Sequence, residues 1–329
     1  MNVLVVGGAG YIGSHAVKRL IEAGHRVAAV DNLCRGHYKA VHPAAAFLEI
    51  GLGNTAGLVH VLRDHRIDCV MHFAALAYVG ESVGDPLAYY DNNTAGTISL
   101  LKAMRETGVK RLVFSSTCAT YGEPTSVPIV ETMRQEPVNP YGWSKWCAER
   151  ILRDWAAADP EFSFAALRYF NVAGSAADGS LGEDHDPETH LIPSLLLAAL
   201  RKRGPVVVFG TDYPTPDGTC IRDYIHVDDL CDAHLVAMEA LRSGDTRVYN
   251  LGIGRGYSVR EVIDAAREAT KIDIPIELGA RRPGDPAVLF ADASKIRREL
   301  GWAARYTEIG SIIATAWNWF RAHPDGYGD

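Results

Sequence analysis

Short runs of apolar residues alternate with amphipathic stretches along the first half of the chain. The apolar runs predict strands at 3–6, 26–30, 69–72, 112–114 and 164–167, and the amphipathic stretches predict helices at 11–23, 56–65, 86–106 and 140–158. This alternation predicts a parallel sheet with helices on both faces. Continuous apolar runs are typical of strands that are buried on both sides. We therefore expect an α/β fold with a Rossmann-type doubly wound parallel sheet.

The alternation fades beyond about residue 170, where glycine, aspartate and proline become frequent. Shorter strands are predicted at 206–209, 248–251 and 274–278, and helices at 227–241, 258–269 and 307–322. We expect one domain over residues 1–171, with return segments near 222–252, and a smaller C-terminal α/β domain mainly over residues 172–329. Because loops on such scaffolds often determine specificity, the smaller domain is expected to bind the substrate.

Composition narrows the class of partner. The net charge of −7 and pI near 5.9 argue against a nucleic-acid or acidic-membrane partner. The longest basic run, Arg201–Arg203, closes a predicted helix, where cations suit the helix dipole. No apolar run reaches the roughly 18 residues of a membrane helix, and the N-terminus has no signal-peptide pattern. The six dispersed cysteines have no metal-ligand spacing, so we expect reduced thiols and a cytoplasmic protein.

A glycine-rich turn connects the first strand to the first helix. Gly7, Gly10 and Gly13 form G-x-x-G-x-x-G. Glycine allows the tight turn and the close approach of a pyrophosphate, which the free N–H groups of the helix N-terminus then bind. Asp31 ends the second strand, where a carboxylate binds the adenosine ribose and repels a 2′-phosphate. The sequence therefore favours NAD over NADP, although Arg35 lies nearby and Asp31 also fits an ordinary turn.

The sequence PYGWSKWCAER contains a candidate catalytic pair. Tyr141 and Lys145 are four residues apart and share one face of a predicted helix, and Pro140 suits its first turn. A free tyrosine titrates near pH 10, which is too high for a base at neutral pH. We expect the Lys145 ammonium to stabilise the phenolate and lower the pKa of Tyr141.

These motifs, with FSST at a strand end, resemble the extended class of the short-chain dehydrogenase/reductase superfamily. Over nearly its full length the chain is similar to the UDP-glucose/UDP-galactose 4-epimerases. The resembling stretches are GGAGYIGSH, VDNL, HFAA with VGESV, YYDNN, YGEP, NPYGWSK, LRYFNVAG, HLIP, FGTDYPTPDGTCIRDYIHVDDL, YNLG and RRPGDPA. The TDYPTPDGT–RDYIHV block is the most specific to that family.

The resemblance implies an activity and a set of contacts. Tightly bound NAD oxidises and re-reduces the sugar at C4 through a 4-keto intermediate, Tyr141 shuttles the proton, and Lys145 also binds the nicotinamide ribose. The other implied cofactor residues are Tyr11, Ile12, Asn32, Phe73, Ala74, Asn92 and Tyr169. The implied substrate residues are Thr117, Asn171, His190, Leu191, Arg222, Arg282, Asp285 and Leu289. Among these, Thr117 contacts the reacting oxygen, the arginines contact the diphosphate, and Asp285 contacts the nucleoside ribose.

Four positions depart from the family pattern. Val6 replaces a common threonine before the glycine turn, and Gly51 replaces an aspartate that meets adenine. Ala77 replaces a lysine that some members place near the pyrophosphate, and His190 replaces an asparagine that touches substrate in some relatives. These differences put the affinity for NAD in doubt more than its identity.

Several alternatives stay open. Leu289, at the implied gate beside the sugar C2 substituent, is intermediate in size, so N-acetylhexosamine or dual specificity remains possible, as does UDP-pentose epimerisation. A 4,6-dehydratase is disfavoured because no carboxylate follows Thr117. A dinucleotide-sensing protein without activity is a further alternative. The resemblance also implies a homodimer formed by the helices near 86–106 and 140–158.

Two other groups of residues suggest weaker hypotheses. The acidic, histidine-containing loop at residues 183–190 is interpreted as solvated charge, and no metal is expected there. Cys118 adjoins Thr117, but nothing in the sequence activates it as a nucleophile.

Overall fold

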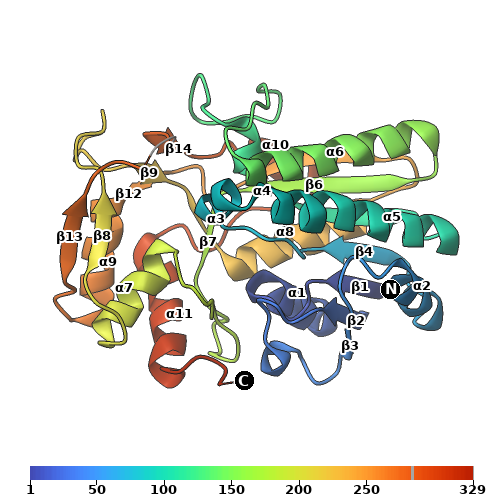
Figure 1. Cartoon of the computed structure of the whole chain (residues 1–329), viewed down its shortest axis with the longest axis horizontal. Coiled ribbons are helices and arrows are strands. Elements are labelled where there is room, and N and C mark those ends of the chain that lie inside the picture. Colours follow the sequence, from blue (N-terminus) through green and yellow to red (C-terminus); the bar gives the residue numbers. More distant parts are fainter. Residues whose placement is uncertain (283–284, 329) are drawn as a thin grey trace.

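A seven-stranded parallel sheet forms the centre of the larger part of the molecule (Figure 1). This computed structural model describes residues 1–282 and 285–328, so Pro283 and Gly284 of RRPGDPA lie outside the described residues. The strand order is β11-β6-β5-β4-β1-β2-β3, and every neighbouring pair is parallel. The strands are β1 Asn2–Val6, β2 Arg26–Asp31, β3 Ala46–Glu49, β4 Cys69–His72, β5 Arg111–Thr117, β6 Ser163–Tyr169 and β11 Thr246–Leu251. The predicted doubly wound α/β fold is confirmed.

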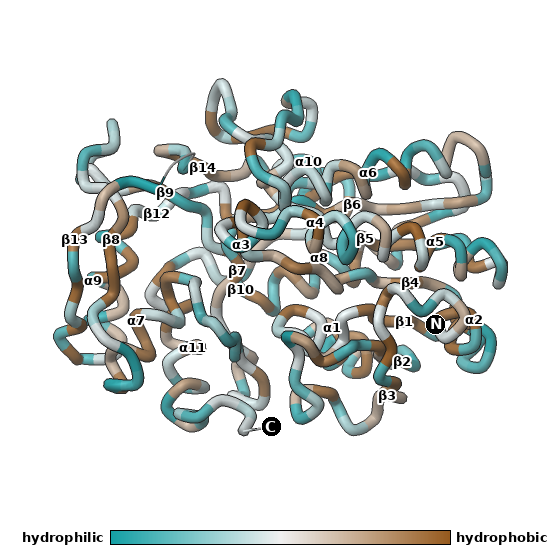
Figure 2. Tube along the Cα trace, in the orientation of Figure 1, coloured by the Kyte–Doolittle hydropathy of each residue, from teal (hydrophilic) through white to brown (hydrophobic). Residues whose placement is uncertain are grey.

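Helices cover both faces of this sheet, and each face has its own hydrophobic core. One core packs against α2 Thr55–Asp64, α5 Gly96–Thr107 and α6 Pro140–Ala158. The other packs against α1 Tyr11–Glu22, α8 Val227–Ala240 and α10 Ser294–Leu300. Figure 2 shows hydrophobic residues concentrated along the central strands, as expected for a sheet buried on both sides.

The helix predicted at 86–106 is divided into three segments. α3 Val79–Gly84 precedes it, and then α4 Pro86–Tyr89, a π-helical segment Tyr90–Ala95 and α5 follow one another. The side chain of Asn93 explains the irregularity, because its amide bonds both the N–H and the carbonyl of Leu76 at 2.9 Å and also Ser144 at 3.0 Å. π-Helical turns are frequent at functional sites. This turn also carries Asn92, one of the implied cofactor residues.

The second half of the chain forms a smaller α/β region on the opposite side from β3 (Figure 1). Its core lies among α7 Leu191–Ala199, α9 Val259–Thr270 and α11 Ile309–Ala322. Its described residues form three small sheets. The first pairs β8 Val206–Phe209 with β13 Ile276–Gly279, and the second pairs β7 Asn171–Ala173 with β10 Tyr224–His226. In the third, β9 Ile221–Arg222 lies between β12 Tyr257–Ser258 and β14 Val288–Leu289. Strands of two or three residues have no hydrophobic periodicity, so the sequence could not predict them.

No helix in the described part of the chain is long and apolar enough to cross a membrane.

A buried ion pair fastens α6 to the sheet. Arg168 of β6 and Glu149 of α6 each have a side chain that is 1% exposed. The guanidinium donates to both carboxylate oxygens, at 2.8 and 2.5 Å, and Ser116 of β5 donates to the same carboxylate at 2.6 Å. Although burial opposes ionisation, the hydrogen bonds from Arg168 lower the pKa of Glu149. One carboxylate therefore ties α6 to two adjacent strands.

We predict that Arg168→Met lowers the free energy of unfolding by about 3–5 kcal/mol, because the buried Glu149 charge then keeps only the half-exposed Arg153, 3.1 Å away, as an ion-pair partner. Urea unfolding followed by circular dichroism measures this change. The double variant Arg168→Met/Glu149→Met removes both charges and should recover most of the loss. A double variant as unstable as the single one would contradict the assignment of the cost to the buried carboxylate of Glu149.

Candidate active site

The glycine turn between β1 and α1 has the shape expected for a pyrophosphate site. Gly7 has a φ of +85°, and a Cβ there would lie 2.5 Å from the backbone nitrogen of Ala74. A Cβ on Gly13 would lie 1.8 Å from the carbonyl oxygen of Gly7. A Cβ on Gly10 would lie 3.5 Å from its nearest neighbour, so packing within the protein does not require glycine there. A ligand that approaches this backbone closely does require glycine. No side chain caps the N-terminus of α1, which leaves its first N–H groups available to an anion.

Asp31 lies at the end of β2, beside this turn. Its carboxylate accepts hydrogen bonds from the backbone N–H of Ala9 at 3.1 Å and of Leu33 at 2.9 Å. It therefore both fixes the glycine turn and stabilises the bend after β2. Arg35 is engaged elsewhere, because its guanidinium contacts Glu81 at 3.0 Å and lies over the ring of Tyr78.

The remaining implied cofactor residues border the same edge of the sheet. Phe73 and Ala74 follow β4, and both donate their N–H to the carbonyl of Val6, at 2.8 and 2.9 Å. Tyr11 and Ile12 open α1, and the Tyr11 hydroxyl donates to the carbonyl of Gly174 at 2.6 Å. The other two are Asn32, which accepts a bond from the N–H of Cys34 at 3.2 Å, and Asn92, which donates to Asn93 at 2.9 Å.

Tyr141 lies in the first turn of α6, against the end of β5. Asn139 caps this turn by accepting a bond from the N–H of Gly142 at 2.8 Å. The hydroxyl of Tyr141 lies near the side chain of Thr117, the last residue of β5, and this side chain acts to lower the pKa of Tyr141. Burial raises the pKa of Tyr141 to about 12, and the Thr117 side chain only partly opposes this rise. In the chain alone, the expected lowering of this pKa by Lys145 is therefore wrong.

Lys145 faces the same strand one turn further along α6. Its ammonium donates to the carbonyl of Ser115 at 2.9 Å and lies 4.8 Å from the centroid of the Phe114 ring. Burial lowers the pKa of Lys145 to about 7. The ammonium is thus directed to the strand rather than to the phenol, and burial accounts for the high pKa of Tyr141.

Ser115 is a site residue that sequence reasoning missed. Its hydroxyl is hydrogen-bonded to the hydroxyl of Tyr169, while its carbonyl accepts the bond from Lys145. It thereby connects an implied cofactor residue to the catalytic pair. The FSST motif contained the signal, since Ser115 and Thr117 are two residues apart on a strand and therefore share one face.

The implied substrate residues come together in the second half of the chain. Arg222 of β9 forms an ion pair with Asp285, and Leu289 of β14 lies opposite Arg222 in the small sheet. Arg282 stacks over the ring of Phe209, with its guanidinium carbon 4.0 Å from the ring centroid. Asn171 begins β7, where it pairs with Tyr224 of β10.

His190 and Leu191 mark the start of α7. The ring of His190 contacts Glu188 at 2.9 Å and Glu183 at 3.0 Å. Although burial opposes the charged form, Glu183 and then Glu188 raise the pKa of His190 to about 10. The interpretation of this loop as solvated charge is wrong, because the side chains of Glu183 and Glu188 are only 5% and 6% exposed.

Cys118 is not an activated nucleophile in this structure, because burial raises the pKa of its thiol to about 12. The chemistry at this edge of the sheet therefore rests on a tyrosine that can exchange a proton, a neighbouring threonine hydroxyl and a buried lysine. A glycine turn for a dinucleotide lies at the same edge, where ligands of open α/β sheets bind.

Comparison with known proteins agrees with this geometry. Residues 3–252 match the sequence profile of the NAD-dependent epimerase/dehydratase family. The chain is 51% identical over 330 residues to a UDP-glucose 4-epimerase of Lacticaseibacillus casei, covering 100% of this chain and 99% of the relative. It is 48% identical over 340 residues to a probable UDP-arabinose 4-epimerase 3 of Oryza sativa subsp. japonica, covering 99% of this chain and 84% of the relative.

A solved structure is similar to this chain in both sequence and fold. The UDP-glucose 4-epimerase of Brucella ovis in complex with NAD superposes with a TM-score of 0.94 at 48% identity, covering 97% of this chain and 98% of that chain. The profile match spans most of the chain, and the identity to these proteins extends over nearly its full length. The chain therefore belongs to the NAD-dependent epimerase/dehydratase family of extended short-chain dehydrogenases/reductases.

Proposed function

We propose that this protein is a UDP-glucose 4-epimerase that interconverts UDP-galactose and UDP-glucose. The observation that carries the proposal is the position of Tyr141 near the side chain of Thr117, at the end of β5 and at the same edge of the sheet as the glycine turn. A sugar hydroxyl placed between these two groups has a proton acceptor and a hydrogen-bonding partner within reach. When bound, NAD supplies the reversible oxidation of the sugar C4 to a ketone, with no net redox change.

Each residue then has a physical task. Tyr141 takes the proton of the 4-hydroxyl and returns it after the keto sugar has presented its other face. Thr117 positions the reacting oxygen, and Lys145 and Tyr169, joined through Ser115, border the cofactor side. Arg222 and Arg282 bind the diphosphate, which suits guanidinium groups, and Asp285 binds the nucleoside ribose. Asn171, His190 and Leu191 complete the substrate side.

A second copy of the chain is proposed to cover α6 and the helices beside it. Large apolar side chains are exposed on this side, including Leu87 at 78%, Trp143 at 37% and Tyr90 at 37%. Exposed apolar groups that lie on adjoining helices are typical of a protein–protein contact.

The proposed location is the cytoplasm, in agreement with six free cysteines.

The protein incubated with UDP-galactose, without added NAD, should form UDP-glucose, which proton NMR detects. Tyr141→Phe should lower kcat by about 100- to 10,000-fold, because it removes the proton carrier. Tyr38→Phe, at a tyrosine that is 62% exposed, is the matched control and should leave kcat unchanged. Full turnover by Tyr141→Phe would defeat the catalytic assignment.

The buried Lys145 should give the nucleotide-free protein a distinctive pH dependence. Its folded pKa of about 7 lies below the ordinary lysine value, so the unfolded chain binds more protons between pH 7 and about 10. The free energy of unfolding should therefore rise with pH in this window, by up to about 1.4 kcal/mol per unit, relative to Lys145→Met. Urea unfolding of both proteins at pH 7, 8 and 9 tests this, and parallel pH profiles would contradict it.

Leu289 is expected to set the substrate range, since it lies opposite Arg222 in the small sheet. Leu289→Tyr should lower kcat/KM for UDP-N-acetylgalactosamine more than for UDP-galactose, because a bulkier ring crowds the C2 substituent. Val288→Tyr is the control, since adjacent strand residues face opposite sides. Equal losses on both substrates with Leu289→Tyr would show that this residue is not the gate.

A further inference from the structure

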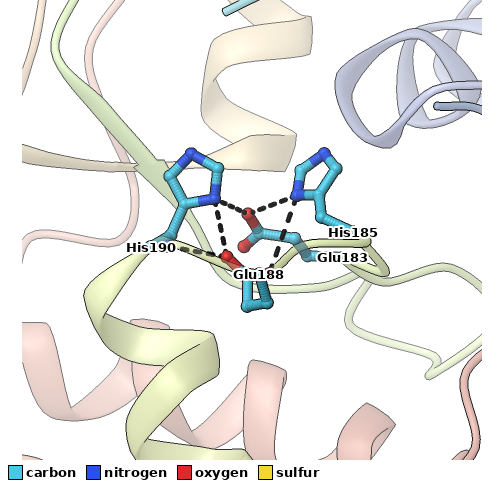
Figure 3. A group of neighbouring side chains, drawn as sticks. All are labelled: Glu183, His185, Glu188 and His190. Atoms are coloured by element: carbon cyan, nitrogen blue, oxygen red, sulfur yellow. Dashed lines mark hydrogen bonds and ion pairs between the residues drawn. The ribbon is translucent and has the colours of Figure 1, made fainter. Parts of the chain in front are cut away.

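Four side chains in the loop before α7 converge on one point, although the proposed reaction assigns a role to only one of them. They are Glu183, His185, Glu188 and His190 (Figure 3). Each offers one ligand atom, and these atoms all lie within 4.8 Å of one another. In Figure 3 both imidazole rings direct a nitrogen toward the carboxylates, and the dashed contacts enclose a common centre.

Four nitrogen–oxygen separations in this group lie near the edge length of a tetrahedral coordination shell. The Nδ1 atom of His185 lies 3.1 Å from Glu183 Oε1 and 3.7 Å from Glu188 Oε2. The Nδ1 atom of His190 lies 3.0 Å from Glu183 Oε1 and 2.9 Å from Glu188 Oε1. A zinc ion with bonds of about 2.0–2.1 Å holds its ligand atoms about 3.3 Å apart. The four distances, which involve both oxygens of Glu188, lie on either side of this value, so the nitrogen and oxygen atoms are within reach of one common ion.

Burial and charge also favour a cation at this point. The side chains of Glu183 and Glu188 are 5% and 6% exposed, and within the described chain the only cationic groups that form ion pairs with them are the two histidines. Metal binding requires both imidazoles to give up their protons, and the two carboxylates then leave a charge of −2, which one divalent ion neutralises. The hydroxyl of Tyr78 is buried without a hydrogen-bond partner, and its ring lies 6.0 and 5.8 Å from the rings of His185 and His190.

We infer that Glu183, His185, Glu188 and His190 bind one divalent transition-metal ion, Zn²⁺ in the first place. Imidazole with carboxylate is a zinc donor set, whereas Mg²⁺ and Ca²⁺ prefer oxygen ligands alone. Because four protein ligands complete the tetrahedral shell, the ion is structural and leaves no coordination position for a substrate. It fixes the loop to the first turn of α7. A cavity of about 110 Å³ is lined in part by Glu183, His185 and Glu188.

Cobalt binding tests this inference directly. The full-length protein, with any affinity tag removed and freed of metal by a chelator, is titrated with Co²⁺. We expect one Co²⁺ per chain, intense visible d–d bands of a tetrahedral site without a thiolate charge-transfer band, and displacement by Zn²⁺. Absence of these bands in the wild-type protein would overturn the inference and leave the cluster as a network of hydrogen-bonded ion pairs. The wild-type spectrum decides the matter even if a variant fails to fold.

Substitutions then locate the site. Loss of an outer-shell partner weakens metal binding by about 10- to 100-fold. Because Glu183 and His185 are direct ligands in this proposal, Glu183→Gln and His185→Gln should each weaken Co²⁺ binding by more than that. Asp186→Asn is the matched control, since Asp186 is an exposed acidic residue of the same loop outside the cluster, and it should bind Co²⁺ as the wild type does. Equal affinity in Glu183→Gln and the wild type would place the metal elsewhere and overturn the assignment.

Discussion

The buried pair of Arg168 and Glu149 determines how the catalytic helix meets the sheet. Charged groups this deeply buried are tolerated only when hydrogen bonds satisfy them, and Glu149 receives such bonds from β6 and, through Ser116, from β5. Ser116 lies between the two residues of β5 that contact the catalytic pair. The register of α6 against β5 is therefore fixed by the same carboxylate, and this register brings Tyr141 to Thr117. The arginine also bonds the hydroxyl of Tyr121 at 2.8 Å, which extends the constraint to the segment after β5.

Burial controls the ionisation of the catalytic pair in opposite directions. Exclusion of water favours the neutral form of each group, so it raises the pKa of Tyr141 and lowers that of Lys145. The neutral form of each side chain is therefore favoured more than in a free amino acid. A positive charge placed near Tyr141 would stabilise its phenolate strongly, because little water is present to screen the interaction. The Lys145 ammonium donates to the carbonyl of Ser115 and not to Tyr141, so Lys145 and Tyr141 interact with different groups.

The fold class and the glycine turn were predictable because both depend on local sequence patterns. Gly7 and Gly13 are required by backbone contacts that a Cβ would violate, and buried parallel strands appear as continuous apolar runs. The π-helical turn at Tyr90–Ala95 was not predictable, because it depends on the hydrogen bonds of Asn93 to a loop 17 residues away in sequence. The burial of Glu183 and Glu188 was missed for a similar reason, since an acidic loop has the same sequence pattern whether it is solvated or folded against other elements.

The substrate side of the site is assembled from short segments that are far apart in sequence. Arg222 and Asp285 are separated by 63 positions, yet their side chains form an ion pair, and β14 lies parallel to β9 beside them. In the proposed reaction the nucleotide must stay anchored while the sugar turns over. An arginine already oriented by a carboxylate loses less side-chain freedom when it binds a diphosphate, so more of the interaction remains available for holding it. In the proposed reaction the small sheet would therefore serve the anchoring step, and the end of β5 with the first turns of α6 would serve the chemical step.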